Sequence, residues 1–137
     1  MQERLRGRGL DVEVRELADS TRTAADAAAA VGCEVGQIVK SLVFRRGAEI
    51  VIVLCAGDRT VDTRALGLER ADAGAARDAT GFAIGGVPPL GHDRELPTLV
   101  DSSLRRFETV WCAGGTPHAV FEVATAELLA VLGAAEY

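Results

Sequence analysis

The chain has 137 residues, the size of one ordinary domain, and we expect a single domain over residues 1–137. Hydrophobic residues make up 48% of it, which excludes an intrinsically disordered chain, and the net charge of −5 is unlike that of a general nucleic-acid binder. No apolar run approaches the ~20 residues of a membrane span, and the first residues lack the pattern of a signal peptide. We therefore expect a cytoplasmic protein without membrane contact.

Helices and strands are mixed along the chain. The patterns predict helices over residues 1–8, 23–31, 62–68, 71–80 and 125–132. They predict strands over residues 11–17, 38–44, 49–55, 96–100, 109–113 and 118–123. Residues 50–54 are apolar on both faces, which is typical of a central strand. Because there is no strict β–α–β rhythm, we predict an α+β fold: a mixed, largely antiparallel, barrel-like sheet flanked by helices.

The cysteines Cys33, Cys55 and Cys112 are widely spaced and form no CxxC pair. With only two histidines in the chain, they make no plausible zinc site. We expect each to behave as a small buried hydrophobic residue in a reducing compartment. A cysteine nucleophile is the alternative, but no neighbouring residue supports it.

Lys40 is the only lysine among 15 basic residues. The composition favours arginine at positions where either cation will serve. The one remaining lysine is therefore expected at a position where a guanidinium does not fit. In the strand over residues 38–44, a period of two places Lys40 on the same face as Ile38, Leu42 and Phe44. Two interpretations stay open: an apolar stem with its head in water, or a cation that lines a pocket.

The loop over residues 85–92 is rich in glycine and proline. Glycines let main-chain amides approach a ligand closely, and prolines stiffen the loop. The N–H groups of Gly86, Val87, Leu90 and Gly91 are candidates for an oxyanion hole or a carboxylate cradle. The alternative is a plain tight connection, because such loops are common.

Three other polar positions are candidates with an ordinary structural alternative. His92 and His118 either lie on the surface or serve the site, and Asp101 is expected to cap the turn into Ser102–Leu104. Ser102 and Ser103 lack the strand–turn–helix setting of a serine nucleophile, so a serine hydrolase triad is not expected.

Taken together, several segments resemble the YbaK and prolyl-tRNA-synthetase-insertion family of aminoacyl-tRNA editing domains, over roughly residues 20–133. Gln37–Phe44 resembles the family's strand with its functional lysine, and Gly85–Pro89 fits its GxxxP loop, preceded by Thr80–Phe82. Leu99–Asp101 followed by Leu104, and Trp111–Gly115, also fall in family order. The order and spacing of these motifs carry the resemblance.

The resemblance implies a YbaK-like fold, hydrolysis of the ester between an amino acid and the tRNA 3′ end, and no metal or organic cofactor. It implies catalytic roles for Lys40, Gly85 and Gly86, with Lys40 near the terminal adenosine and its phosphate. The substrate-binding residues that it implies are Val87, Pro89, Gly91, Asp101, Gly114, Gly115 and His118. The chain offers no evident general base, so hydrolysis would depend on positioning, on amide donors and on substrate hydroxyls.

The segment around the last glycine pair bears on the substrate. The cysteinyl-specific branch usually has a serine before this pair and an aspartate beyond it, whereas this chain has Ala113 and apolar residues near Ala119 and Val120. Gly115–His118 instead resembles the insertion-domain branch, where a histidine helps to define the pocket. We expect a trans-acting deacylase of tRNA(Pro) that carries cysteine, alanine or another small amino acid, with prolyl-tRNA synthetase as a candidate partner.

Two other functions stay open. One is a non-catalytic module that keeps the fold and the pocket but only binds a tRNA end, a nucleotide or a synthetase. The negative charge and the missing serine and aspartate of the cysteinyl-specific branch keep this alternative open. The other is a small-molecule esterase or amidase, which is weaker because no nucleophile with a partnered base is evident.

Overall fold

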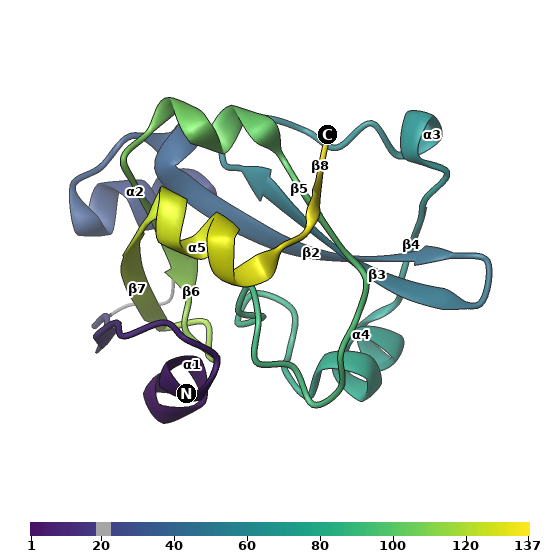
Figure 1. Ribbon diagram of the computed structural model, residues 1–137, viewed down its shortest axis with the longest axis horizontal. Helices are drawn as coiled ribbons and strands as arrows, with labels where there is room; N and C mark the ends of the chain where they lie inside the picture. Colours follow the sequence, from purple (N-terminus) through teal and green to yellow (C-terminus); the bar gives the residue numbers. More distant parts are fainter. Residues whose placement is uncertain (19–22) are drawn as a thin grey trace.

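The computed structural model describes residues 1–18 and 23–137. Its helices are α1 (Gln2–Gly7), α2 (Ala24–Val31), α3 (Thr63–Leu66), α4 (Ala73–Thr80) and α5 (Thr125–Leu132), with short 3₁₀ helices η1 (Val35–Gln37) and η2 (Ser102–Arg106). Its strands are β1 (Val14–Glu16), β2 (Ile38–Arg46), β3 (Glu49–Ala56), β4 (Glu69–Arg70), β5 (Thr98–Val100), β6 (Thr109–Ala113), β7 (Ala119–Ala124) and β8 (Ala135–Glu136) (Figure 1). The predicted helices and strands are all present.

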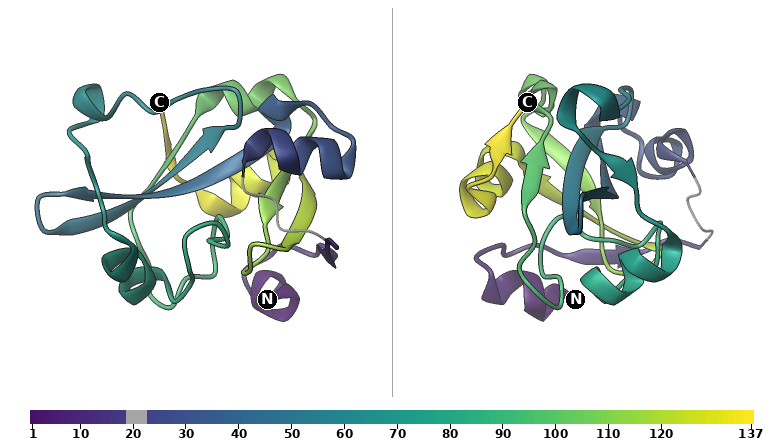
Figure 2. Two further views of the ribbon diagram at one scale, coloured as in Figure 1. Left: turned by 180° about the vertical axis from the view of Figure 1, so that it is seen from behind. Right: turned by 90° about the vertical axis from the view of Figure 1, so that its right-hand side faces the viewer.

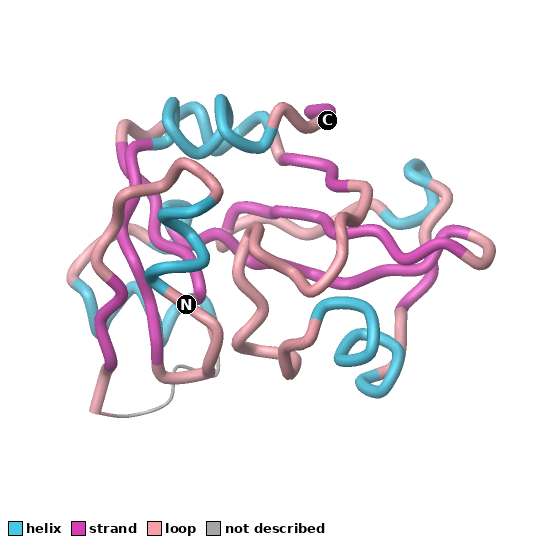
Figure 3. The backbone as a smooth tube through the Cα atoms, turned by 60° about the horizontal axis from the view of Figure 1, so that its bottom comes forward, coloured by secondary structure: helices cyan, strands magenta, loops and turns pink. Residues whose placement is uncertain are grey.

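The strands form one 8-stranded mixed sheet in the order β1-β7-β6-β2-β3-β5-β8, with β4 paired to β2. The long pairings β2–β3 and β6–β7 are antiparallel, whereas β6–β2, β3–β5 and β5–β8 are parallel. Strands β6 and β7 run steeply across the direction of β2 and β3, so the sheet is strongly turned (Figure 3). The predicted fold, a mixed sheet flanked by helices, is confirmed.

The β2–β3 hairpin is the longest pairing, from Val39–Ala56 to Arg46–Glu49. Gly47 is the first residue of its tight turn and has a φ of 62°. Two-residue hairpin turns need a positive φ at this position, which glycine adopts readily. The chain therefore turns at Gly47 and Ala48, and both strands extend beyond their predicted ends. Residues 51–56 are buried, as expected for a central strand.

The other edge of β2 is only partly paired. Ile38 and Val39 pair with Trp111 and Cys112 of β6, and Phe44 and Arg45 pair with β4. Within the described parts of the chain, no strand pairs with residues 40–43 on this side. This gap in the sheet positions the candidate site.

Helices cover both faces of the sheet. Helix α5 crosses one side of β2 and α2 lies on the other side, while α1 and α4 lie below (Figures 1 and 2). The main core contains Leu54, Val100, Phe121 and Leu128, all 0–1% exposed. A separate cluster places Ala27 and Ala28 of α2 against Ile38, Trp111 and Val120. The alanines of α2 therefore let this helix approach the sheet closely.

The structure differs from the prediction in its shortest elements. The strand predicted over residues 96–100 begins only at Thr98, because Pro97 has no N–H to donate, although its carbonyl accepts a hydrogen bond from Ile52 N–H. The strand predicted over residues 11–17 is limited to β1, and β4 and β8 were not predicted. No helix in residues 1–18 and 23–137 has the length and hydropathy to cross a bilayer.

Candidate active site

A pocket of about 550 Å³ lies beside the open edge of β2. Its walls come from α2, β2, β6, the start of β7 and the glycine-rich loop. The residues that line it include Ala24, Ala27, Val35, Ile38, Val39, Lys40, Ser41, Leu42, Ile84, Gly85, Val87, Trp111, Cys112, Ala113, Pro117 and Val120. The lining is largely apolar and many of its side chains are small, so the pocket suits a compact ligand with few polar groups.

Among the described residues, 1–18 and 23–137, Lys40 is the only charged side chain in this lining. Its Nζ donates a hydrogen bond of 2.6 Å to the carbonyl oxygen of Arg59. This hydrogen bond fixes the position of the ammonium. An ammonium has three donors, so two remain for a ligand. Of the two interpretations that the sequence left open, the structure supports the cation that lines a pocket.

Ser41, which was not predicted as a site residue, adds main-chain and side-chain polar groups. The carbonyl of Ile38 accepts a hydrogen bond of 2.7 Å from Gly57 N–H, so Ile38 directs its main-chain groups toward β3. Since alternate residues of a strand direct these groups to opposite sides, the N–H and C=O of Ser41 are directed toward the gap. Its Oγ is buried without a hydrogen-bond partner among the described residues. Such a group is expected to bind water or a ligand.

Gly85 and Val87 of the glycine-rich loop line the same pocket as Lys40. Gly85 has a φ of 95°, which most side chains avoid. Ile84, beside it, is 58% exposed and also lines the pocket, so it forms an apolar rim. A large apolar residue within a glycine-rich loop is a signal from which the sequence could have identified it.

Gly86 lies behind this lining. Its N–H donates to the carbonyl of Ala83 at 3.0 Å, so this amide is already occupied in the structure. A Cβ at this position would lie 2.8 Å from Cα of Thr116. The visible role of Gly86 is therefore to let two loops pack together.

The second loop connects β6 and β7 and contains Gly114, Gly115 and His118. Gly114 N–H donates to the carbonyl of Ala119 at 2.8 Å, and a Cβ on Gly114 would lie 2.8 Å from Cγ1 of Val14. His118 is exposed and does not line the pocket, although its neighbours Pro117 and Ala119 do. The end of the β6–β7 loop and the start of β7 therefore reach the border of the pocket through Pro117 and Ala119, whereas His118 lies outside it.

Asp101 is only 3% exposed and caps η2, as predicted. Its carboxylate accepts hydrogen bonds from the N–H groups of Ala56 and Ser103, at 3.1 and 2.9 Å, and Oδ2 lies 3.7 Å from Nε of Arg59. Burial acts to raise the pKa of Asp101, but hydrogen bonds from Ser103 and Ala56 outweigh it and hold the pKa below its usual value. Asp101 does not line the pocket; it anchors Arg59, whose carbonyl holds Lys40.

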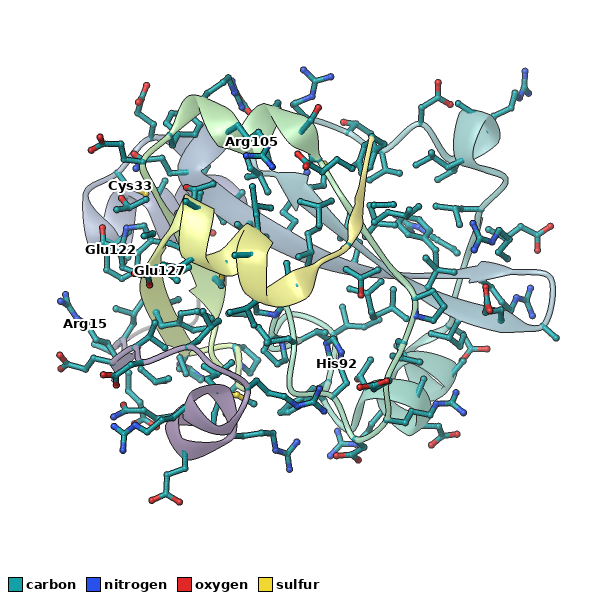
Figure 4. All side chains as sticks on the ribbon, viewed as in Figure 1. Arg15, Cys33, His92, Arg105, Glu122 and Glu127 are labelled. Atoms are coloured by element: carbon teal, nitrogen blue, oxygen red, sulfur yellow. The ribbon has the colours of Figure 1, made fainter. Side chains whose placement is uncertain are left out.

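Pro89 and Gly91 lie in a second depression of about 380 Å³, together with Arg8, His92 and Arg94. His92 is 8% exposed and its Nε2 lies 2.8 Å from the carbonyl oxygen of Pro88 (Figure 4). Burial lowers the pKa of His92. The surface location considered for His92 is therefore wrong, and Pro89 and Gly91 are separated from Lys40.

Cys55 and Cys112 are buried as expected, whereas Cys33 is only partly buried, so the expectation was wrong for Cys33. Cys112 lines the pocket, but complete burial raises the pKa of its thiol, and burial likewise raises the pKa of Cys55. A thiol with a raised pKa is a poor nucleophile at neutral pH. No group of three or more metal-ligating side chains occurs in the part of the chain that the structure describes. The pocket therefore provides a cation, main-chain groups and apolar walls.

Comparison with known proteins agrees with this geometry. The sequence profile of the aminoacyl-tRNA editing domain matches residues 18–131. This chain belongs to the aminoacyl-tRNA editing domain family. The resemblance predicted from the sequence is thus confirmed.

Relatives of this editing domain align with most of its length. It is 31% identical over 123 residues to the uncharacterised protein YwhH of Bacillus subtilis (strain 168), covering 85% of this chain and 78% of YwhH. A crystal structure of a candidate trans-editing enzyme for prolyl-tRNA synthetase is 48% identical, with a TM-score of 0.92 over 99% of this chain and 91% of the other. The structure of the hypothetical protein APE2540 is 30% identical, with a TM-score of 0.87 and coverage of 98% and 94%.

Proposed function

We propose that this editing domain is a trans-acting deacylase that hydrolyses the ester of a misacylated tRNA. The expected substrate is tRNA(Pro) that carries a small amino acid such as cysteine or alanine. The observation that carries the proposal is the convergence of Lys40, Gly85 and Val87, from two distant segments, on one pocket in an editing-family fold. The similarity to a candidate trans-editing enzyme for prolyl-tRNA synthetase supports the choice of tRNA(Pro) and makes this synthetase a candidate partner.

The pocket dimensions suit a tRNA end with a small aminoacyl group. A volume of about 550 Å³ is enough for a nucleoside-sized ligand. Ala24 and Ala27 of α2 and Ala113 of β6 form parts of the wall that larger side chains would fill. The open edge of β2 at Ser41 offers main-chain groups to the polar groups of the aminoacyl moiety.

Lys40 suits a role in electrostatics. In the reaction, a water oxygen adds to the ester carbonyl carbon, and the ribose oxygen then leaves with a proton. Negative charge develops on the carbonyl oxygen, and the ammonium of Lys40 would stabilise this charge or bind the terminal phosphate. Because no carboxylate or imidazole of the described residues lines the pocket, the proton would travel through water or a substrate hydroxyl.

The same observation favours a second candidate, a non-catalytic module that binds a tRNA end. Within the part of the chain that the structure describes, the pocket is lined by one ammonium and no acid–base side chain, which is sufficient for binding. Such a module would bind charged and uncharged tRNA without releasing the amino acid.

A deacylation assay separates the two functions. Purified protein is mixed with Cys-, Ala-, Ser- or Pro-charged tRNA(Pro), and release of the labelled amino acid is followed under single-turnover conditions. We expect faster release of a small wrong amino acid than of proline. Release of no amino acid, together with measurable tRNA binding, would establish the binding module instead.

A further inference from the structure

Helix α1 lies outside the segment that matches the editing-domain family, which begins at residue 18. Strand β1 follows it and pairs with β7 at the edge of the sheet. The side chain of Gln2 accepts a hydrogen bond of 3.0 Å from Val14 N–H, which holds α1 to this strand. The helix thereby lies below the sheet, near the glycine-rich loop (Figure 1).

Arg4 of α1 contacts both ends of the glycine-rich loop. Its Nη1 donates a hydrogen bond of 2.9 Å to the carbonyl oxygen of Gly91 and lies 3.4 Å from Oδ1 of Asp93. The same guanidinium lies 5.5 Å from the centroid of the Phe82 ring, within the range of a cation–π contact. Phe82 and Gly91 flank the segment that contains Gly85 and Val87, so one side chain bridges the two ends of this segment.

Close packing supports the same arrangement. A Cβ on Gly91 would lie 3.3 Å from Cδ of Arg4, and Gly91 has a φ of 83°. The Phe82 ring packs edge-on against His92, with centroids 6.5 Å apart. A Cβ on Gly115 would lie 3.4 Å from Phe82 and 3.5 Å from Met1. Helix α1 therefore contacts the glycine-rich loop and the β6–β7 loop together.

We propose that Arg4 is a positioning residue that closes the base of the loop over residues 82–91 and so holds Gly85 and Val87 in the pocket wall. This inference rests on the proposed function for its effect on catalysis. Arg4 itself does not line the pocket, so it would act only through the loop. A planar guanidinium can donate to a carbonyl while its face lies on an aromatic ring, which an ammonium does less well.

The first test measures the loop without requiring activity. Amide hydrogen exchange reports local opening, and the N–H of Gly86, bonded to the carbonyl of Ala83, lies within the loop. In Arg4→Ala we expect exchange at Gly86 to become about tenfold faster, as loss of a charge-assisted hydrogen bond allows. Arg4→Lys should show an intermediate rate.

Arg6→Ala is the matched control. Arg6 is on the same helix, but its ion pair, Nε to Oδ1 of Asp11 at 3.5 Å, does not involve the loop. It should leave exchange at Gly86 unchanged, and because this ion pair is exposed it should hardly change the melting temperature. Equal exchange in the two variants would overturn the positioning role, because a general weakening of α1 would then explain both.

The second test measures deacylation by the full-length protein. We expect Arg4→Ala to lower kcat about fivefold with little change in KM, Arg4→Lys to recover part of the loss, and Arg6→Ala to match the wild type. An unchanged kcat alongside faster exchange would overturn the catalytic part of the inference. If the wild-type protein released no amino acid, the proposed function would fail, and exchange at Gly86 would still decide whether Arg4 holds the loop.

Discussion

The glycine-rich loop has two sides with different surroundings. Gly85 and Val87 face the apolar pocket that contains Lys40. Pro89, Gly91 and His92, a few residues later, face a polar depression on the other side. Neighbouring positions of one motif therefore contribute to different parts of the molecule.

The charges of the two regions also differ. Among the described residues, the pocket has Lys40 as its one cation beside apolar walls, whereas the depression contains Arg8, Arg94 and Glu95. An ammonium beside apolar walls attracts an anion strongly, because little solvent screens the interaction. In the depression, opposite charges lie in solvent, where each attracts a ligand more weakly. The comparison indicates chemistry on the pocket side of the loop and support on the other side.

Replacement of Lys40 is expected to have the largest effect. Lys40→Met keeps an apolar stem and removes the ammonium, and it should lower kcat/KM for deacylation about 100-fold. Lys40→Arg should also be impaired, because a wide planar group replaces a compact one. Arg8→Met, on the other side of the loop, is the control and should retain activity. Full activity in Lys40→Met would show that the pocket side of the loop does not carry the chemistry.

Gly86→Ala tests whether the two loops must touch. The added Cβ would lie 2.8 Å from Cα of Thr116, a main-chain atom that cannot easily move. We expect the free energy of unfolding to fall by about 1–3 kcal/mol, measured by urea denaturation. Gly7→Ala adds the same methyl group where nothing lies within 4 Å, and its stability should not fall, because alanine is favoured over glycine in a helix. Similar stability of the two variants would show that the loop contact is dispensable.

Ile84→Ala tests whether the rim of the pocket contacts the ligand. Since Ile84 is 58% exposed, its truncation should change the free energy of unfolding by less than about 0.5 kcal/mol. It should weaken binding of a tRNA 3′-end analogue about fivefold, because apolar contact with the ligand is lost. Ile50→Ala, on β3 away from the pocket, should not alter binding. Unchanged affinity in Ile84→Ala would place the ligand elsewhere.

The smallest expected effect is on pH dependence. Burial lowers the folded-state pKa of His92; Arg8 adds to this, whereas the Pro88 carbonyl and Asp93 oppose it. The unfolded chain therefore takes up a proton first as pH falls. The stability contributed by neutral His92 is complete above its ordinary pKa of 6.5 and is lost as pH falls through the folded value.

Thermal unfolding between pH 7.5 and pH 5 measures this contribution. His92→Gln should lose less stability on acidification than the wild type. His118→Gln removes the exposed histidine and should retain the wild-type slope. A wild-type slope in His92→Gln would show that buried His92 does not control the pH response.

Much of the fold could be predicted because local patterns fix local elements. The helix predicted over residues 23–31 is α2, which Thr23 caps through a hydrogen bond from Asp26 N–H. The strand predicted over residues 38–44 is the main part of β2, which contains Lys40. The β6–β7 hairpin and α5 also lie where their sequence patterns indicate. Strand period and helix caps depend on neighbouring residues, so one sequence is enough to read them.

The site was predicted less completely. Lys40, Gly85 and Val87 share the pocket, but Pro89 and Gly91 face away from it, and Asp101 acts through Arg59. Ser41 and Ile84 line the pocket without having been predicted as site residues. A motif gives the order of residues along the chain but not the side of the loop to which each one turns.

The sequence by itself therefore determined the longer helices and strands, the choice of Lys40 and the family. Only the tertiary structure decided that β6 and β4 leave the edge of β2 open at residues 40–43, and that α1 lies under the glycine-rich loop. The physical reason is that both features depend on pairings between distant segments. Their geometry is set by packing and main-chain hydrogen bonds across the whole sheet, which no local pattern specifies.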